Sequence, residues 1–183
     1  MKRWVSAVGL AVATLFLAGC NRTGGATSRP ADEAAAAAPY LNHAQPRLPT
    51  LKLWLGSAEL EAEVARRNVE IYTGMMFRTN LADTAAMLFV FPTPDRRSFY
   101  MRNTQVPLTA AYLAPDGTVL ELHDLKPFDE TPAASQSDNI QFVLEVPKGW
   151  FQRHNVTTGA VIRTPYGGLA ELDWRTLRAR GRP

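Results

Sequence analysis

Five polar side chains lie within otherwise apolar segments of this chain and are the first candidates for a functional site. They are Arg78, Arg102, Asn103, Thr104 and Glu145. A charged group is costly to bury unless it is paired, so these positions predict either internal ion pairs or a small pocket. In a pocket, Arg78 or Arg102 would bind an anionic group with help from Asn103, because the planar guanidinium matches carboxylate and phosphate geometry.

The same residues also have a structural and a catalytic interpretation. In the structural one, Glu145 accepts hydrogen bonds from an arginine or from backbone amides and fixes the strands, while Asn103 and Thr104 turn the chain between strands. In the catalytic one, Glu145 pairs with Asp124 or Asp116 as the two carboxylates of a hydrolase. The sequence leaves these alternatives open, and no residue is assigned as catalytic.

Other kinds of chemistry have less support. The histidines are His43, His123 and His154, and none has an obvious nucleophile beside it. No glycine-rich phosphate loop is present. Four methionines fall in the same segments as the polar candidates, namely Met75, Met76, Met87 and Met101. Clustered methionines can bind Cu(I), but methionine more often fills irregular cores. We therefore expect no metal and no cofactor, and the balance is against an enzyme.

The first twenty residues have the three parts of a secretion signal. Lys2 and Arg3 precede an apolar run that extends to Leu17, and the segment ends in Leu-Ala-Gly-Cys at residues 17–20. This tetrapeptide resembles the lipobox of bacterial lipoproteins. The resemblance implies that residues 1–19 are removed as a signal peptide and that Cys20 carries lipid, with acyl chains such as palmitate. Several chains at about 0.8 kcal/mol per buried CH₂ give durable anchoring.

A lipid on Cys20 predicts a protein of the cell envelope, attached to the membrane through that residue. Cys20 is the only cysteine, so the chain cannot form an intramolecular disulfide. Asn21 follows it, where lipoproteins retained at the inner membrane typically carry Asp. By this resemblance, the periplasmic face of the outer membrane is favoured if the organism has two membranes.

The mature chain divides into three parts. Residues 20–49 are rich in small residues and proline, which predicts a lipidated cysteine followed by a flexible tether. Residues 50–174 have the patterns of a packed domain, and residues 175–183 form a basic tail. Removing Lys2 and Arg3 from the 20 basic residues leaves 18 against 17 acidic ones, a net charge of +1. With no basic stripe interleaved with aromatic residues, we expect no nucleic-acid binding.

The elements that must position the polar candidates are mostly strands. Alternating apolar residues predict a hairpin at residues 51–64 around Gly56, with Glu59, Glu61 and Glu63 facing solvent. Further strands are expected at residues 88–91, 98–102, 110–113, 119–125, 142–146 and 161–163. The spacing of apolar residues from Arg66 predicts one helix of about three turns, with Gly74 near its end. The fold class is therefore α+β and mainly antiparallel, a compact sheet or partly closed barrel of about seven short strands with one helix.

Four segments in this region resemble the domain-of-unknown-function family 192. They are GMMFR at residues 74–78, MLFVF at 87–91, FYMRNT at 99–104 with VPL at 106–108, and FVLEV at 142–146 followed by GW at 149–150. The resemblance implies a compact β-rich domain, often exported, and supplies no established reaction, ligand or partner. The departures are Ala86 in place of glycine, and Thr109 and Ala160 where relatives often carry an acid. A role of those acids in relatives, metal ligation included, is not carried over to this chain.

We therefore expect a lipid-anchored binding or accessory module of the cell envelope. Its ligand would be a small anion, a glycan or an envelope protein. The alternatives are an envelope hydrolase that uses Glu145 with a second carboxylate, and a purely structural module. The three hypotheses differ in whether the polar candidates meet in one open cleft, which the sequence alone does not decide.

Overall fold

Alternation of apolar and polar residues builds the first hairpin of the fold, β1 (Thr50–Leu55) and β2 (Ala58–Ala65). Leu53 lies opposite Leu60 in the antiparallel register, and both side chains are buried. Gly56 turns the chain between the strands with a φ of 62°, a left-handed conformation that glycine adopts without steric cost. The hairpin predicted around Gly56 is therefore confirmed.

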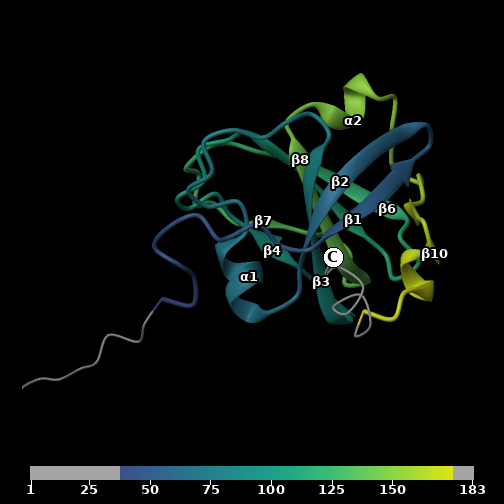
Figure 1. Ribbon diagram of the computed structural model, residues 1–183, viewed down its shortest axis with the longest axis horizontal. Coiled ribbons are helices and arrows are strands. Elements are labelled where there is room, and N and C mark those ends of the chain that lie inside the picture. Colours follow the sequence, from purple (N-terminus) through teal and green to yellow (C-terminus); the bar gives the residue numbers. More distant parts are fainter. Residues whose placement is uncertain (1–37, 175–183) are drawn as a thin grey trace, which may run out of the picture. The chain divides into compact units, whose positions relative to one another are not determined.

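The computed structural model describes residues 38–174 (Figure 1). The predicted signal peptide at residues 1–19, the lipidation site Cys20, most of the tether and the basic tail at 175–183 lie outside the described residues. No helix within the described part of the chain is long and apolar enough to cross a membrane. The other elements are α1 (Asn68–Thr73), β3 (Ala85–Asp95), β4 (Ser98–Phe99), β5 (Leu108–Leu113), β6 (Val119–Leu125), β7 (Ala133–Ala134), β8 (Ile140–Pro147), α2 (Trp150–Arg153), β9 (Arg163–Thr164), β10 (Gly167–Gly168) and the 3₁₀ helix η1 (Leu169–Glu171).

The strands form one mixed sheet of eight and a separate pair. The order in the large sheet is β10-β9-β1-β2-β3-β8-β5-β6, and β4 pairs with β7. β2 and β3 run parallel, and the other strand pairs among the described residues are antiparallel. An isolated bridge between Thr118 and Val161 links the start of β6 to the segment before β9, but the sheet is not a closed barrel. The α+β, mainly β class is confirmed.

The number and length of the elements differ from the prediction. Ten strands are described instead of about seven. β7 and β10 were not expected, and the strands expected at residues 98–102 and 161–163 are present only as the two-residue strands β4 and β9. Two short α-helices are described instead of one. Two-residue strands leave almost no periodic pattern in a sequence. The pairing of these short strands depends on distant neighbours rather than on their own residues.

The predicted three-turn helix is shorter than its apolar spacing indicated. α1 has six residues and ends at Thr73, because Gly74 takes a positive φ of 46° and donates its amide to the Glu70 carbonyl. A Cβ at Gly74 would lie 3.3 Å from the Phe89 ring. Glycine therefore allows the chain to leave the helix close to the sheet, and Met76 lies beyond the helix end.

β3 continues through Pro92 and Pro94 and ends at Asp95, beyond the expected end at residue 91. Its pairing with β8 runs from Met87 to Val90, and the register then shifts before Asp95. Proline has no N–H to donate to a sheet. Pro92 and Pro94 both fall in this interrupted stretch, where the ladder does not need their amides.

Both faces of the central strands β3, β8 and β5 are buried, each against its own hydrophobic core. The first core contains Leu88 and Leu144, and Trp150 of α2 lies within it. The second core contains Phe89 and Val143, together with residues of the loops after α1 and after β4. The two-layer covering of these strands means that a polar side chain on either face is held inside the domain.

Residues 38–49, which were expected to belong to the tether, include side chains that pack against the domain. The Gln45 side chain is buried, and its amide nitrogen donates to the carbonyls of Glu70 and Gly74 at the end of α1. The Leu48 amide donates to the Glu63 carboxylate. Helix ends leave backbone carbonyls without intrahelical partners. Gln45 adds a second donor to the Glu70 carbonyl, which also accepts the Gly74 amide, and it donates to the Gly74 carbonyl just beyond the helix. The packed part of the chain therefore begins before residue 50.

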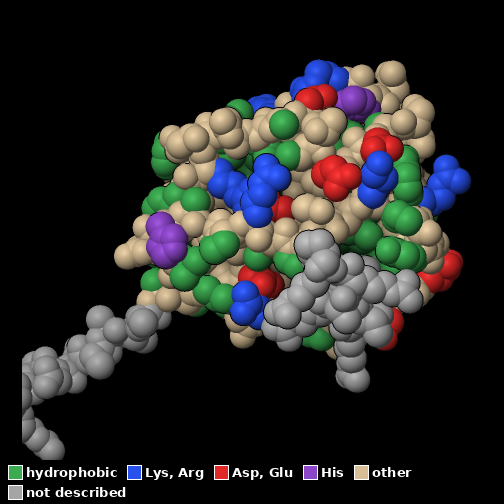
Figure 2. All heavy atoms as spheres, in the orientation of Figure 1, with side chains coloured by type: hydrophobic (Ala, Val, Ile, Leu, Met, Phe, Trp, Pro, Cys, Tyr) green, Lys and Arg blue, Asp and Glu red, His purple; other side chains and the backbone are tan. Residues whose placement is uncertain are grey.

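Surface charges of both signs are mixed on the domain. Figure 2 shows basic and acidic side chains interspersed with hydrophobic ones on the face in view. The Lys52 ammonium lies 2.7 Å from the Glu59 carboxylate, and an Arg153 guanidinium nitrogen lies 2.5 Å from the Asp83 carboxylate. Exposed pairs of this kind add little to stability, so the fold depends on its two cores and on internal polar contacts.

Candidate functional site

The central strand β8 places Glu145 on the face of the sheet that carries the second core. Successive side chains of a strand point to opposite faces, so Glu145 points the same way as Val143. Its cross-strand neighbours are Met87 on β3 and Ala110 on β5, and Ile71 of α1 packs against the same core. The Glu145 carboxyl therefore lies in the middle of an apolar surface, far from either sheet edge.

The Glu145 carboxyl is buried without a partner. The residue is only 5% exposed, and no described residue forms a hydrogen bond or an ion pair with its side chain. Burial disfavours the charged form and raises the pKa of Glu145 to about 8. At neutral pH the carboxyl is therefore mostly protonated, with one O–H donor and a free acceptor oxygen. The arginine or backbone donors of the structural interpretation are not found among the described residues.

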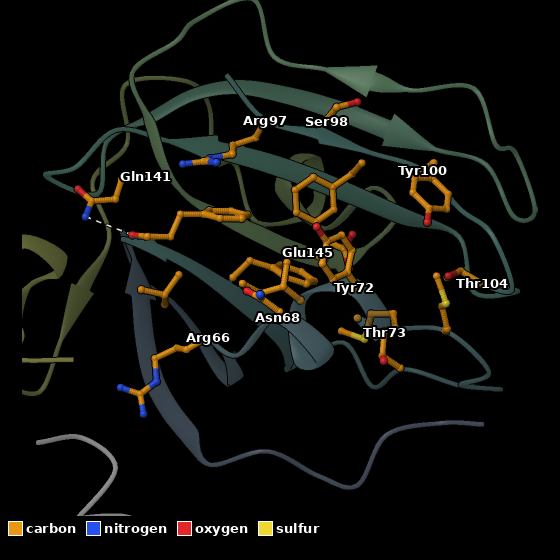
Figure 3. Close-up of a pocket in the computed structure, with 18 of the residues that line it drawn as sticks. Arg66, Asn68, Tyr72, Thr73, Arg97, Ser98, Tyr100, Thr104, Gln141 and Glu145 are labelled. Carbon is orange, nitrogen blue, oxygen red and sulfur yellow. Dashed lines mark hydrogen bonds between the residues drawn. The ribbon is translucent and has the colours of Figure 1, made fainter. Parts of the chain in front are cut away.

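Glu145 faces a cavity of about 680 Å³ (Figure 3). This volume lies within the range of small-molecule sites. The cavity is bounded by α1, β3, β4, the segments that follow α1 and β4, and β8. Its wall is rich in aromatic rings, which belong to Tyr72, Phe89, Phe91, Phe99, Tyr100 and Trp174. Such a wall can hold an apolar or aromatic ligand body.

The polar residues are distributed unevenly around this cavity. In the view of Figure 3, Arg66 and Arg97 lie toward one side of Glu145. Tyr100 and Thr104 lie toward the other side. The cavity therefore has an arginine side and an uncharged side. On the arginine side, Arg97 lies above Glu145, while Arg66 lies below it with its guanidinium pointing away from Glu145.

Of the five residues selected from the sequence, Thr104 and Glu145 line the cavity. Thr104 is buried, and its hydroxyl donates to the Arg102 carbonyl. Asn103 shapes the backbone, because it adopts a φ of 55°, a conformation that asparagine tolerates better than most residues. Its carbonyl accepts the Phe77 amide. This bond joins the loop after β4 to the turn after α1, and both segments contribute to the cavity wall.

Arg102 lies on the surface and does not line the cavity. Its guanidinium binds the Glu130 carboxylate, and its side chain is 43% exposed. The guanidinium carbon is 5.5 Å from the centre of the Tyr100 ring, and one nitrogen is 3.4 Å from the Tyr40 hydroxyl. All of these partners lie within the chain, so Arg102 stabilises the loop after β4 from outside.

Arg78 forms an internal ion pair with Glu63. Two guanidinium nitrogens lie 2.6 and 2.8 Å from the two carboxylate oxygens, a bidentate geometry. Glu63 was expected on a solvent-facing strand face but is buried, because Arg78 and Leu48 cover that end of β2. Burial acts to raise the pKa of Glu63, but the hydrogen bonds from Arg78 and the Leu48 amide outweigh it and lower the pKa. The Arg78 guanidinium is thus bound to Glu63, and Arg78 does not line the cavity.

The geometry offers no second carboxylate for hydrolysis. Glu145 is the only acid among the described residues that line the cavity. Asp116 binds the Thr118 amide in the turn before β6, and Asp124 lies 3.4 Å from the Lys148 ammonium. Neither lines the cavity. Within residues 38–174, no three His, Cys, Asp or Glu side chains are grouped as a metal site would require.

Arg97 and Tyr72 line the cavity but do not stand out in the sequence. Arg97 lies in the short connection between β3 and β4, where no periodicity indicates the direction of a side chain. Tyr72 has the position of a core residue in the helical pattern, although it is 50% exposed. One usable signal was present, because Phe99 and Met101 share a face by strand spacing and both line the cavity.

The chain was compared with known families and structures. Residues 52–164 match DUF192, described as an uncharacterised ACR. A protein from Sinorhizobium meliloti 1021, described provisionally as a transcription regulator, is 28% identical with a TM-score of 0.59 over 63% of this chain and 92% of that chain. A protein of unknown function from Novosphingobium aromaticivorans DSM 12444 is 31% identical with a TM-score of 0.57 over 62% of this chain and 83% of that chain. No curated protein matches. Since the family match covers more than half of the sequence, this chain belongs to the DUF192 family.

Proposed function

We propose that this protein is a lipid-anchored module of the cell envelope that binds a small molecule in the cavity beside Glu145. The observation that carries this proposal is the buried carboxyl of Glu145, which has no partner among the described residues and faces an aromatic cavity. The carboxyl opens only onto this cavity, so its hydrogen-bonding capacity is left to whatever occupies that space. A carboxyl with a strongly perturbed pKa at the wall of an apolar cavity is typical of a ligand site, since a bound molecule can form hydrogen bonds with it.

Binding is favoured over catalysis by the composition of the cavity. Its described lining includes arginines, aromatic residues and one acid, without a histidine or cysteine. A general acid alone can assist a reaction, but glycoside hydrolysis uses two carboxylates, and nucleophilic catalysis uses an activated side chain. A purely structural module, in turn, would have no use for an open volume of about 680 Å³.

Binding is tested through the methionine methyl groups. Met75, Met76 and Met101 line the cavity, whereas Met87 is fully buried and does not. The mature chain, with Cys20→Ser to keep it free of lipid, is labelled with ¹³C at the methionine methyls. It is then screened by NMR against small acids, amines, sugars and nucleosides. We expect a binding compound to shift the signals of the three lining methionines, and to shift that of Met87 less, since Met87 senses the ligand only through its cross-strand neighbour Glu145.

Two results would contradict the binding proposal. One is a screen in which no compound moves the three cavity signals. The other is a set of binders that shift Met87 more than the three lining methionines, because that pattern places the change inside the core rather than in the cavity. Glu145→Leu is a second check, since it removes the carboxyl and fills part of its space. We expect this variant to lose binding of compounds that carry a hydrogen-bond acceptor.

The export and anchoring part of the proposal is supported by the Leu-Ala-Gly-Cys sequence at residues 17–20. We expect cells grown with an alkyne analogue of palmitate to label the wild-type protein and to recover it with membranes. Cys20→Ser is expected to lose the label and the membrane association, since the thiol is the acceptor of the diacylglycerol. Equal labelling of both proteins, or a soluble wild type, would contradict anchoring through Cys20.

A further inference from the structure

We infer that the ligand of this cavity is a small amphipathic anion. Its apolar or aromatic body lies against the rings of the wall, and its carboxylate or phosphate group lies at the arginine side. This inference rests on the proposed function and specifies the chemical class of the ligand. It is carried by the charges of the lining, by the way one arginine is held, and by the state of Glu145.

The described lining has an excess of positive charge. Arg66, Arg96 and Arg97 all contribute to it. The only acid among them, Glu145, is buried and has no cation beside it. In a partly enclosed site, field lines are focused and screened less than on an open surface. An anionic group therefore gains most of its attraction at the side where the arginines lie.

Arg97 is held in place before any ligand binds. Its Nε lies 3.4 Å from the Ile140 carbonyl, and its Nη2 donates to the Thr93 carbonyl. Its guanidinium carbon lies 4.1 Å from the centre of the Phe91 ring. Burial lowers the pKa of Arg97 more than the attraction of the nearby Asp95 carboxylate raises it, yet an arginine stays charged in proteins. Its Nη1 has no partner in the described part of the chain, so a pre-positioned and partly desolvated donor remains for an anion.

Arg66 supplies a second, less constrained cation. It stands just before α1 and is half-buried. Its backbone amide donates a hydrogen bond to the Glu70 carboxylate at 2.9 Å. This bond fixes the position of the Arg66 backbone. Its guanidinium forms no hydrogen bond or ion pair with another described residue. The guanidinium points away from Glu145 in Figure 3, so it adds positive charge at the edge of the cavity, and its removal breaks no internal contact.

The Glu145 carboxyl favours an anion over a cation as well. In its protonated form it donates an O–H to a ligand oxygen, and it adds no negative charge that would repel an acid. A cationic ligand would meet a mostly uncharged carboxyl and would lie near the arginines. The aromatic rings of the wall can attract a cation. The experiment must therefore compare an amine with an acid.

The experiment uses three compounds that share one body and differ only in the terminal group. They are 4-phenylbutyrate, 4-phenylbutan-1-ol and 4-phenylbutylamine. Each is titrated into the labelled mature chain at about pH 6.5 while the methyl signals of Met75, Met76 and Met101 are followed. Because a charge-assisted hydrogen bond contributes about 1.5–3 kcal/mol, we expect the acid to bind about tenfold or more tightly than the alcohol, and the amine to bind weakest. Added salt should weaken the binding of the acid and leave the binding of the alcohol unchanged.

Two arginine variants locate the anion. Arg97→Gln is expected to reduce the ratio of acid to alcohol affinity several-fold and Arg66→Gln to reduce it less, with little effect of either on the alcohol itself. Arg66→Gln is the safer variant, because no described contact depends on its guanidinium. Arg153→Gln is the matched control, since Arg153 is on α2, pairs with Asp83 and does not line the cavity. It should leave the ratio unchanged.

The inference is overturned if the amine or the alcohol binds as tightly as the acid, or if the acid keeps its advantage in both arginine variants. Either result leaves small-molecule binding in the cavity intact and removes only the anionic class. If none of the three compounds moves the cavity methyls, the inference also fails. The proposed function itself fails only if the broader compound screen gives no binder either.

Discussion

Glu145→Gln is expected to gain stability relative to the wild type as the pH rises, by several kcal/mol at pH 8.5. The reason is the burial that raises the pKa of this carboxyl from 4.5 to about 8. A buried carboxyl must either keep its proton at a pH where the unfolded chain would release it, or ionise without the solvation that water gives the charge. Both alternatives reduce the stability of the fold. Glutamine is neutral at every pH and has a similar shape, so it avoids both costs.

The direction follows from the two pKa values. Below about pH 4.5, Glu145 is protonated in the folded and the unfolded chain, and it contributes no pH dependence. Between about pH 4.5 and 8, the unfolded chain releases the proton while the folded chain retains it, so stability falls with rising pH. Above about pH 8 the loss is complete. At about 1.4 kcal/mol for each pH unit in this window, its upper limit is about 5 kcal/mol.

Urea unfolding of both proteins at intervals from pH 4.5 to 8.5 measures this difference. Trp150 is fully buried and provides a fluorescence signal. A buried glutamine has its own cost, but that cost does not change with pH. The readout is therefore the slope of the stability difference with pH rather than its value at one pH.

Glu121→Gln is a control with the opposite expected slope. Burial acts to raise the pKa of Glu121, but the amides of Ser137 and Gln136, with His123, outweigh it and lower the pKa. Its stabilising contribution is present above its unfolded pKa and is lost as the pH falls. Glu121→Gln should therefore be less stable than the wild type near neutrality, and the gap should close in acid. If Glu145→Gln instead runs parallel to the wild type, Glu145 is an ordinary ionised carboxylate, and the neutral donor invoked for ligand binding is absent.

Local features of this domain could be predicted from the sequence because neighbouring residues determine them. The β1–β2 hairpin follows from alternation around Gly56. The end of α1 follows from Gly74. β8 follows from a run of buried apolar residues around Glu145. In each case the period of the pattern or the freedom of glycine is visible within a few positions.

The cavity could not be predicted, because its wall is assembled from segments that are distant in the sequence. Tyr72, Arg97 and Glu145 lie on α1, on the β3–β4 connection and on β8. Whether Glu145 would find a partner depended on which side chains reached its face of the sheet. The packing of Gln45 against the end of α1 depended in the same way on carbonyls about 25 residues further along. The composition of residues 20–49, rich in small residues and proline, predicts that Gln45 belongs to the tether.

The two arginine candidates show this limit most clearly. Arg78 and Arg102 both stand beside apolar residues in motifs of the family, and the local sequence does not indicate which of them is buried. The structure separates them, since Arg78 pairs with Glu63 inside the domain and Arg102 pairs with Glu130 at the surface. Their difference lies in burial, which makes their expected contributions to stability very unequal.

Arg78→Met is accordingly expected to destabilise the domain by about 3 kcal/mol or more at pH 7, the usual cost of breaking a buried ion pair. The substitution retains an unbranched apolar side chain and removes both hydrogen bonds to the Glu63 carboxylate. Glu63 would then remain buried with only the Leu48 amide as donor. Urea unfolding of the wild type and the variant at one pH measures the loss.

Two further variants decide whether the loss comes from an isolated buried charge. Arg102→Met removes the same functional group from an exposed pair and should cost little. Glu63→Leu combined with Arg78→Met removes both charges, and it should recover much of the stability that Arg78→Met loses, because replacing a buried pair by apolar residues is often nearly neutral. A double variant that is as unstable as Arg78→Met would mean that the pair contributes through its geometry rather than by neutralising Glu63. Equal losses in Arg78→Met and Arg102→Met would contradict the assignment of Arg78 to the interior, and Arg78 would again become a candidate for ligand binding.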